Sequence, residues 1–383
     1  MRLYLVGGAV RDMLLGIPAR EHDFLYIGSD QELKRAFPRA RPAGKAFPIH
    51  VAGPLEFAPA RGETLAEDLA RRDLTINAMA LEVPVPNREP EEPLAQASGL
   101  LHAHPQALDD LRQGVLRAAS PTAMQDDPLR VFRAARFAAQ LPEFLVHDEL
   151  MDAMRRTAGL GLLEDISAER VGVEMRKALH APKPGRFLEV LDQANCLSPW
   201  FQELAGARQV PAGPAPYHDG DVLAHVLEVM ERIAGNPLVA YMALCHDLGK
   251  CATDPAIWPH HYEHEHRGAD MAETLGHRLR LPMRWIRAGI DAAKLHMKAG
   301  KYGSLRPGTR VDLLMRLHAG KLTKEMFALA RADSIHTPQD YTDQAMADLD
   351  RILAVDLPPH LRNMGEESGK KLRELRCMAL ASG

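Results

Sequence analysis

The sequence predicts an α+β protein in which a small N-terminal α/β unit precedes a helical neck, a second helical domain and a helical tail. Up to about residue 60, short β-type runs alternate with helical patterns. From Leu108 onward, apolar residues recur at helical spacing almost throughout. Segment 209–221, QVPAGPAPYHDGD, is rich in proline and glycine and is the best candidate for a linker. We expect domains over residues 1–105, 106–205, 206–345 and 346–383.

The composition is that of an ordinary globular protein. The 383 residues, 46% of them hydrophobic and 26% charged, suffice for two or three domains with a substantial core. A net charge of −4 means that a nucleic-acid partner would need a local basic surface. We find neither a signal peptide nor an apolar run long enough to span a bilayer, and therefore expect a cytoplasmic protein without a membrane partner. Four scattered cysteines form no CxxC pair, which argues against a zinc knuckle or a secreted disulfide framework.

The elements of the N-terminal unit follow from local patterns. Helices are expected where apolar residues recur at helical spacing, over 9–16 and 30–37, and Thr64 is placed as the N-cap of a helix in 64–81, TLAEDLARRDLTINAMAL. Segment 83–96, VPVPNREPEEPLAQ, is expected to be a surface loop because it is rich in proline and charge. Strands are expected over the short β-type runs 2–6, 23–28, 47–53 and 55–60.

Helical patterns dominate the remainder of the chain. The apolar spacing predicts helices to the end of the chain, interrupted by the linker candidate. The first of these helices cover 127–141, 166–180, 186–197 and, after the linker candidate, 238–250.

The first chemical constellation follows the first strand. Gly7 and Gly8 stand between that strand and a helix, where backbone N–H groups without neighbouring Cβ atoms can approach phosphate oxygens. Arg11, one turn into the helix, can reach the same phosphates. Glu21 and Asp23 are two residues apart on a strand and therefore point to one face, where two carboxylates suit Mg²⁺. Together these features indicate metal-assisted nucleotidyl transfer. The alternative is a tight turn followed by a solvated strand edge.

The motifs LVGGAVRD, RRDLTINAMA and DDPLRVFRAARFAA, in this order with the acidic pair, resemble the bacterial tRNA nucleotidyltransferases (CCA-adding enzymes) and bacterial poly(A) polymerase. The resemblance covers the chain to about residue 200. It implies that Glu21 and Asp23 bind the catalytic Mg²⁺ ions and that Glu56 stands where a third carboxylate is expected. It places Gly8 and Arg11 at the nucleotide, and it assigns the ribose and triphosphate to Arg71, Arg72, Asp73 and Asn77.

The base-reading motif of that family, Glu-Asp-x-x-Arg, corresponds here to Asp126, Asp127 and Arg130. An aspartate accepts a hydrogen bond from the exocyclic amine that cytosine and adenine share, and an arginine donates to their ring acceptors. Asp127 and Arg130 are three residues apart, so on one helix they would share a face. Arg133 and Arg136 continue this face toward phosphate, with an ordinary surface salt-bridge ladder as the alternative.

Two departures from the family pattern bear on activity. The first carboxylate is glutamate rather than aspartate, and its extra methylene displaces the carboxyl group. In addition, EFAPARGETLAEDLARRD runs through without most of the polar, Gly-rich loop that the family associates with the switch from adding C to adding A. The shortened loop resembles that of enzymes that add only two C residues, and it also fits a paralogue with weak or redirected transferase activity.

A second constellation lies in the C-terminal half, where seven histidines fall between His218 and His266. The apolar helix LVAYMALCHDLGK ends in His246 and Asp247, and a carboxylate beside such a run is costly unless it is paired or binds metal. With His225 before it and Asp333 after it, the order resembles the HD phosphohydrolase superfamily. We expect these four residues as metal ligands, with His264 and His296 as further candidates because HHYEHEH offers several alternatives.

Imidazole and carboxylate ligands together suit Ni²⁺, Mn²⁺ or another transition metal better than Mg²⁺. Such a metal would generate hydroxide near neutral pH for attack on a phosphate ester. An HD domain after a transferase head resembles the multifunctional CCA proteins. That resemblance implies phosphatase, 2′-nucleotidase and 2′,3′-cyclic phosphodiesterase activities and extends coverage to about residue 340.

Residues 278–324 form a basic segment with twelve lysines and arginines against two acids, Asp291 and Asp312. It could follow an RNA backbone such as a tRNA acceptor arm, although about half of these charges fit an ordinary helix surface.

We therefore expect an enzyme that adds C, with addition of A left open, from CTP and ATP to tRNA 3′ ends and also hydrolyses phosphate esters, as a monomer or homodimer. The alternative is an HD phosphohydrolase whose weak or inactive head binds RNA or nucleotide.

Overall fold

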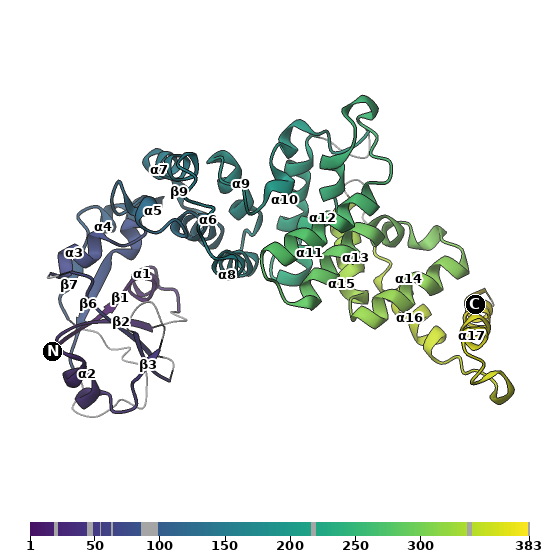
Figure 1. The fold of residues 1–383 in the computed structure, drawn as a ribbon, viewed down its shortest axis with the longest axis horizontal. Helices are drawn as coiled ribbons and strands as arrows, with labels where there is room; N and C mark the ends of the chain where they lie inside the picture. Colours follow the sequence, from purple (N-terminus) through teal and green to yellow (C-terminus); the bar gives the residue numbers. More distant parts are fainter. Residues whose placement is uncertain are drawn as a thin grey trace. The chain divides into compact units, whose positions relative to one another are not determined.

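The computed structural model describes residues 1–18, 22–43, 49–53, 55–62, 64–85, 99–215, 220–334 and 339–381. The chain divides into two compact units, residues 1–165 and 166–383 (Figure 1). Within the described residues, no helix is long and apolar enough to cross a membrane.

A seven-stranded mixed sheet forms the first unit, in the order β3-β4-β5-β2-β1-β6-β7 (Figure 1). The antiparallel neighbours of β1 (Arg2–Val6) are β2 (His22–Ile27) and β6 (Met79–Val83). β5 (Leu55–Pro59) pairs with β2 in parallel. β4 (Ile49–Ala52) and β3 (Arg41–Ala43) complete one edge, and β7 (Leu101–Ala103) forms the other.

The central strands are buried on both faces, because successive residues of a strand point to opposite sides of the sheet. On one face Tyr4 and Leu25 join a buried cluster with Leu69 of α3 (Leu65–Ala70). On the other face Phe57 stacks on Phe24 with ring centroids 5.4 Å apart and packs against Phe37, which caps the C-terminus of α2 (Asp30–Ala36). The sheet therefore forms the core of the first unit.

The prediction of a single helix over 64–81 is wrong beyond the first two turns of that helix. Thr64 is the N-cap, and its hydroxyl accepts from the Glu67 amide as expected, but α3 ends at Ala70. A turn at 71–73 and the short helix η1 (Thr75–Asn77) follow, and the chain then enters β6 beside β1. The mostly apolar run 79–83 is thus buried by sheet pairing rather than in a longer helix.

The other helices of the first unit are α1 (Gly8–Leu14), α4 (Ala107–Gln113), α5 (Ala123–Asp126), α6 (Arg130–Gln140) and α7 (Asp148–Gly159). The short strands β8 (Val115–Leu116) and β9 (Leu145–Val146) pair with each other, and the sequence patterns did not indicate them. The helix expected from residue 127 starts later, because Asp127 precedes a proline and is extended, with φ −145° and ψ 97°. Asp127 and Arg130 therefore do not share a helix.

The second unit is helical, which confirms the predicted fold class. α13 (Met283–Gly300) packs against four of its helices: α11 (Pro237–Cys245), α12 (His264–Arg278), α14 (Pro307–Gly320) and α15 (Thr323–Asp333). The other helices of the unit are α8 (Ala168–Leu179), α9 (Gly185–Gln193), α10 (Val222–Arg232), α16 (Thr342–Leu353) and α17 (Glu366–Ala381).

The proline-rich linker candidate is partly described, and its described part packs within the second unit. The carbonyl of Ala212 accepts from the Lys250 ammonium at 2.7 Å. The carbonyl of Pro211 accepts from His261 Nε2 at 2.7 Å. These bonds hold residues 211 and 212 to the helices that follow them in the chain.

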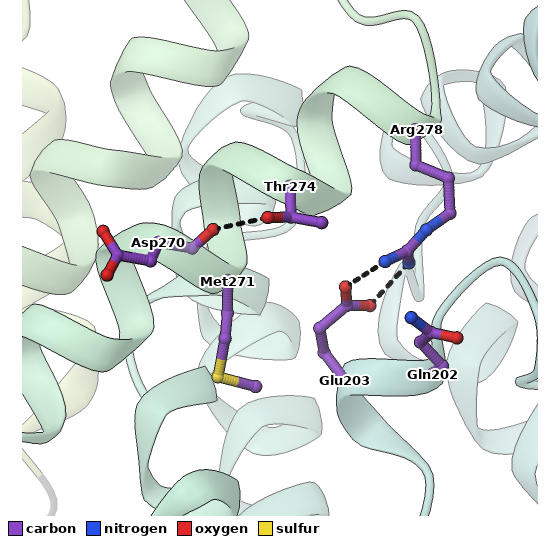
Figure 2. A pocket seen from close by; sticks show the side chains of 6 residues that line it. All are labelled: Gln202, Glu203, Asp270, Met271, Thr274 and Arg278. Atoms are coloured by element: carbon purple, nitrogen blue, oxygen red, sulfur yellow. Dashed lines mark hydrogen bonds and ion pairs between the residues drawn. The ribbon is translucent and has the colours of Figure 1, made fainter.

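An open pocket of about 480 Å³ lies between α12 and η2 (Gln202–Leu204) (Figure 2). Glu203 and Arg278 form a two-pronged ion pair across it, at 2.8 and 2.5 Å. Arg278 also donates to the carbonyl of Trp200, so its charge is already neutralised within the protein. We interpret this pocket as a structural contact that fastens η2 to α12.

Candidate functional sites

The glycine turn and the acidic strand meet at one edge of the sheet. Gly7 has φ +68°, which favours glycine, and its amide donates to the Met79 carbonyl. Val6, just before this turn, lies opposite Asp23 on β2, and Asp23 lies beside Glu56 on β5. Register partners on neighbouring parallel strands point to the same face, so the carboxyl groups of Asp23 and Glu56 share a face next to the turn. Both residues are exposed.

Glu21, the other predicted metal ligand of the head, lies outside the described residues. Asp23 and Glu56 by themselves supply two oxygen ligands of the kind that a hard divalent cation prefers.

Arg11 lies beside Gly8 of the glycine turn and is held by a hydrogen bond to Asn77. A Cβ on Gly8 would stand 3.4 Å from Arg11 Nη2, so glycine leaves room for the guanidinium. Arg11 Nη1 donates to Asn77 Oδ1 at 2.7 Å, and Asn77 Nδ2 donates to Asp73 Oδ1 at 3.0 Å. All three side chains are buried. Three of the predicted nucleotide-binding residues thus form one hydrogen-bonded chain behind the turn.

Arg133 of α6 extends this hydrogen-bonded chain beyond Asp73. Its guanidinium binds Asp73 Oδ2 at 2.7 and 2.8 Å. Burial opposes ionisation of Asp73, but Arg133 and the hydrogen bonds from Asn77 and the Leu74 amide hold the pKa of that carboxyl group well below its ordinary value. Asp73 is therefore an anion that fixes two arginines of the site, Arg133 directly and Arg11 through Asn77.

The short connection between β5 and α3 is fastened at Arg61. The amide of Arg61 donates to Asp68 Oδ1 at 3.0 Å, and the Arg71 guanidinium donates to the Arg61 carbonyl. Asp68 also accepts from Arg72 at 2.9 Å and is buried. Two predicted nucleotide-binding residues, Arg71 and Arg72, thus lie beside the place where the sequence lacks the long loop.

Arg130, expected to read a base, supports the turn that carries Arg71 and Arg72. Its guanidinium is buried and donates to the carbonyls of Arg71 at 2.6 Å and Ala123 at 2.9 Å. Asp127 is half-buried at the break between α5 and α6. Nη1 also donates to the Arg72 carbonyl at 3.4 Å. Arg130 therefore joins α5 and α6 to the nucleotide segment, and its remaining donors are Nε and the second N–H of Nη2.

The four residues predicted as ligands in the second unit converge. His225 of α10 and His246 lie 3.2 Å apart at their Nε2 atoms. Both Nε2 atoms approach Asp247 Oδ2, at 3.3 and 3.2 Å, and Asp333 Oδ1, at 3.0 and 3.4 Å. His225, His246 and Asp247 are almost wholly buried, a combination expected for a metal centre rather than for a surface cluster.

The two further candidates complete a second group around the same aspartate. His264 Nε2 and His296 Nε2 each lie 3.6 Å from Asp247 Oδ1. The Nδ1 atoms of His246, His264 and His296 face backbone carbonyls at 2.7–2.9 Å, which leaves Nε2 for a ligand. Among the described residues, Asp247 Oδ1 and His264 Nε2 are buried without a hydrogen-bond partner, as expected where a cation belongs.

Charge in this centre favours a bound cation. Burial opposes ionisation of Asp247, but His246 and Lys250 hold the pKa of its carboxyl group well below the ordinary value. Burial alone would lower the pKa of His246, yet the carboxylates of Asp247 and Asp333 raise it to about 10, so a cation that binds His246 would take the place of a proton. Burial lowers the pKa of His296 to about 4, so its imidazole is neutral and able to bind metal.

Lys250 and Gly249, which the sequence analysis did not assign, also shape the centre. Lys250 is buried, and its ammonium lies 2.7 Å from Asp247 Oδ2. A Cβ on Gly249 would stand 1.9 Å from the His264 carbonyl, so only glycine permits this approach of η4 (Leu248–Ala252) to α12. The spacing HDLGK contained both residues, but only the packing shows what they contact.

Three families match the chain in succession. The Poly A polymerase head domain matches residues 3–56, and the probable RNA and SrmB-binding site of polymerase A matches residues 143–207. The HD domain matches residues 222–337, which include the four predicted metal ligands of the second unit.

Relatives match nearly the whole length. The Multifunctional CCA protein of Methylococcus capsulatus is 35% identical over 99% of this chain and 94% of its own length. That of Azoarcus sp. is 38% identical over 86% of this chain and 81% of its own.

Solved structures agree with this match. A tRNA-processing enzyme with CTP is similar with a TM-score of 0.58 and 25% identity, covering 98% of this chain and 96% of that one. The Thermotoga maritima CCA-adding enzyme complexed with tRNA shares the fold with a TM-score of 0.59 at 19% identity, covering 100% and 91%. The chain belongs to the family of multifunctional CCA proteins and is a metal-dependent tRNA nucleotidyltransferase with an HD domain.

Proposed function

We propose that the sheet edge beside Gly7 and Gly8 binds the triphosphate of CTP or ATP, with Asp23, Glu56 and Glu21 as ligands of Mg²⁺. The observation that carries this proposal is the register of three strands, which sets the glycine turn and two carboxylates side by side. A divalent cation there supplies Lewis-acid chemistry for attack of the RNA 3′ hydroxyl and departure of pyrophosphate.

The buried chain from Asn77 to Arg133 supports the role of Arg11 in this site. Arg11 lies over Gly8 and donates to Asn77, so its guanidinium is positioned before a nucleotide binds. Arg71 and Arg72 lie beside the short connection, and Gly7 faces Arg72 Nη1, 3.5 Å from the position of a Cβ. We assign the triphosphate to Arg11, Arg71 and Arg72.

We propose that Asp127 and Arg130 recognise the base of the incoming nucleotide. Asp127 lies at a break between helices, where its carboxyl group can accept from the amine shared by cytosine and adenine. Arg130 would donate to the ring acceptors with the N–H groups of Nε and Nη2 that the carbonyls of Arg71, Arg72 and Ala123 leave over. Arg133 would act through Asp73 rather than on the base, because its guanidinium is bound to that carboxylate.

The short connection between β5 and α3 bears on which nucleotides are added. The connection has only five residues, 60–64, and cannot supply a long loop, and Arg61 within it is held by its bonds with Asp68 and Arg71. We infer that addition of C is retained and that addition of A is the step most affected.

The HD centre, in this proposal, holds Ni²⁺, Mn²⁺ or a similar transition metal on His225, His246, Asp247 and Asp333, with His264 and His296 around the second oxygen of Asp247. The donor set of imidazole and carboxylate supports this choice. A metal held by these residues would supply the chemistry for phosphate-ester hydrolysis by lowering the pKa of water. Lys250 would hold Asp247 in place through its ion pair at 2.7 Å.

A single preparation tests both activities. tRNA that ends at the discriminator base is incubated with Mg²⁺ and labelled CTP, ATP or both, and the products are separated at single-nucleotide resolution. A 2′,3′-cyclic phosphate is then supplied with Ni²⁺ or Mn²⁺. We expect addition of C and hydrolysis of the cyclic ester. Brisk hydrolysis without incorporation of either nucleotide would favour the alternative of a binding head on a phosphohydrolase.

A further inference from the structure

A row of cations lies on the exposed side of α13. Three of these cations, Arg287, Lys294 and Lys298, lie on α13, and the fourth, Lys301, is its C-cap residue. Their spacings of seven, four and three residues place them on one side of the helix. All four are exposed. At a rise of 1.5 Å per residue the row is about 21 Å long.

Neighbouring acids do not neutralise this row. Asp291, the acidic residue on the same side of α13, is buried and bound to Arg316 at 2.8 Å. Asp312 of α14 is bound to Arg373 at 2.7 Å. Among the described residues, none forms an ion pair with Arg287, Lys294, Lys298 or Lys301. Lys298 interacts with the Asp312 carboxylate only through space, after the direct ion pair of that carboxylate with Arg373.

The rest of the basic segment behaves differently. Arg278 is neutralised by Glu203, and Arg284 lies 3.6 Å from Glu325. Arg310 donates to the Gly303 carbonyl and lies 3.5 Å from Asp348. These three arginines hold helices and turns together. Arg306, Lys321 and Lys324 of the segment are exposed as well, but the cations that follow one another along a single helix are those of α13.

The row is separate from the HD centre. His296 follows Arg287 by nine residues, two and a half helical turns, and therefore points to the opposite side of α13. It is buried beside Asp247. α13 thus presents a metal ligand to the interior and the cations to solvent.

We propose that the α13 row binds the phosphate backbone of the RNA substrate, an inference that rests on the proposed nucleotidyltransferase function. Lysines dominate the row, and a lysine contacts phosphate as a point charge without reading base edges. A membrane-bound helix would need a broad exposed apolar face, whereas α13 packs its apolar residues on α11, α12 and α15. An acidic protein partner would need a desolvated apolar core, and beside the row only Met283 and Met297 are exposed large hydrophobics.

The test compares two triple variants of the full-length enzyme in its metal-loaded form. Lys294→Gln, Lys298→Gln and Lys301→Gln neutralise the row. The control combines Lys34→Gln and Lys370→Gln, which neutralise exposed lysines elsewhere, with Lys371→Gln, which neutralises a half-buried lysine 2.9 Å from Glu374. The Kd for tRNA lacking its 3′ CCA is measured from 50 to 300 mM salt, together with the KM and kcat of CMP addition and with thermal unfolding.

For the row variant we expect the slope of log K against log salt to become less steep by about 2, because each lost phosphate contact contributes about 0.7–0.9. KM for tRNA should rise about tenfold or more while kcat, thermal unfolding and hydrolysis of a small cyclic nucleotide stay unchanged. A salt slope and a KM for tRNA equal to those of the control variant would overturn the proposal. This result is expected if the row binds an acidic protein instead of RNA. Absence of CMP addition by the wild-type enzyme would instead refute the proposed function.

Discussion

At the scale of single residues, Asp247 is the key side chain of the second unit. Oδ2 receives His225, His246 and Lys250 at 2.7–3.3 Å. Oδ1 faces His264 and His296 at 3.6 Å. One carboxylate therefore belongs to two groups of candidate ligands, and its loss should disable both.

Asp247→Asn should abolish hydrolysis and leave transfer intact. The amide keeps the shape but removes the charge on which both ligand groups depend, so we expect hydrolysis of a 2′,3′-cyclic phosphate to fall at least about 100-fold. Bound transition metal, measured by elemental analysis, should be lost in parallel. CMP addition should stay within about twofold. Asp254→Asn, which changes only an N-cap, is the control. Loss of both activities would contradict two independent centres.

Asp73→Asn should weaken the first unit in a pH-dependent way. Arg133 and Asn77 hold the Asp73 pKa below its ordinary value of 3.8, so the carboxylate stabilises the fold above that pH and loses this contribution as pH falls below it. We expect the variant to be less stable by about 1–2 kcal/mol at pH 7, since the partly exposed Arg133 is screened. Urea unfolding at pH 7, 5 and 3 measures the difference, which should shrink at pH 3. A difference that grows on acidification would rule out this role.

At the scale of elements, the sequence predicted the regular parts better than the connections. β1, β2 and α2 match their expected bounds within a residue, because alternation and the Ser29 capping box are local signals. The end of α3 could not be predicted, since the Arg130 guanidinium, about 60 residues away in sequence, binds the carbonyls of Arg71 and Arg72. β6 is likewise a strand because it pairs with β1, and no local pattern reveals such a partner.

Gly249→Ala should disrupt the HD centre without touching a ligand. A methyl group would stand 1.9 Å from the His264 carbonyl, so η4 and α12 must separate and His264 must move from Asp247. We expect a loss of about 1–3 kcal/mol in stability and weaker metal binding, measured by denaturation and calorimetric titration with Mn²⁺. Gly369→Ala, on an exposed helix with open space around it, should leave both unchanged. Unaltered Mn²⁺ affinity in Gly249→Ala would show that this packing does not position the ligand.

At the scale of the whole molecule, the two sites lie in separate compact units and use different ligand chemistry. The site in the first unit offers carboxylates at a sheet edge, and the site in the second offers buried imidazoles and carboxylates between helices. The order of histidines and aspartates predicted which side chains gather in the second unit, because each of them lies on a helix or at its end. The glycine turn and Asp23 were predicted as neighbours, but their proximity to Glu56 follows from strand order, which depends on the whole sheet.

Removal of metal should distinguish the activities of the two units. Treatment with a strong chelator, followed by dialysis into Mg²⁺ alone, should restore CMP addition but not hydrolysis of the cyclic ester. The unfolding temperature of the second unit should also drop, because bound metal stabilises the folded state that holds it. Readdition of Ni²⁺ or Mn²⁺ should recover both properties. Recovery of hydrolysis in Mg²⁺ alone would contradict the assignment of a transition metal.

The central claim is that the carboxylates beside the glycine turn hold the cation for nucleotide addition, and rapid-quench measurement of a single CMP addition tests it most directly. Asp23→Asn is compared with wild type and with Asp30→Asn, whose side chain only accepts from Tyr26 on the same unit. We predict a loss of at least about 1,000-fold for Asp23→Asn, roughly 4 kcal/mol of transition-state stabilisation, and little change for Asp30→Asn. A rate for Asp23→Asn within a few-fold of wild type would contradict the account.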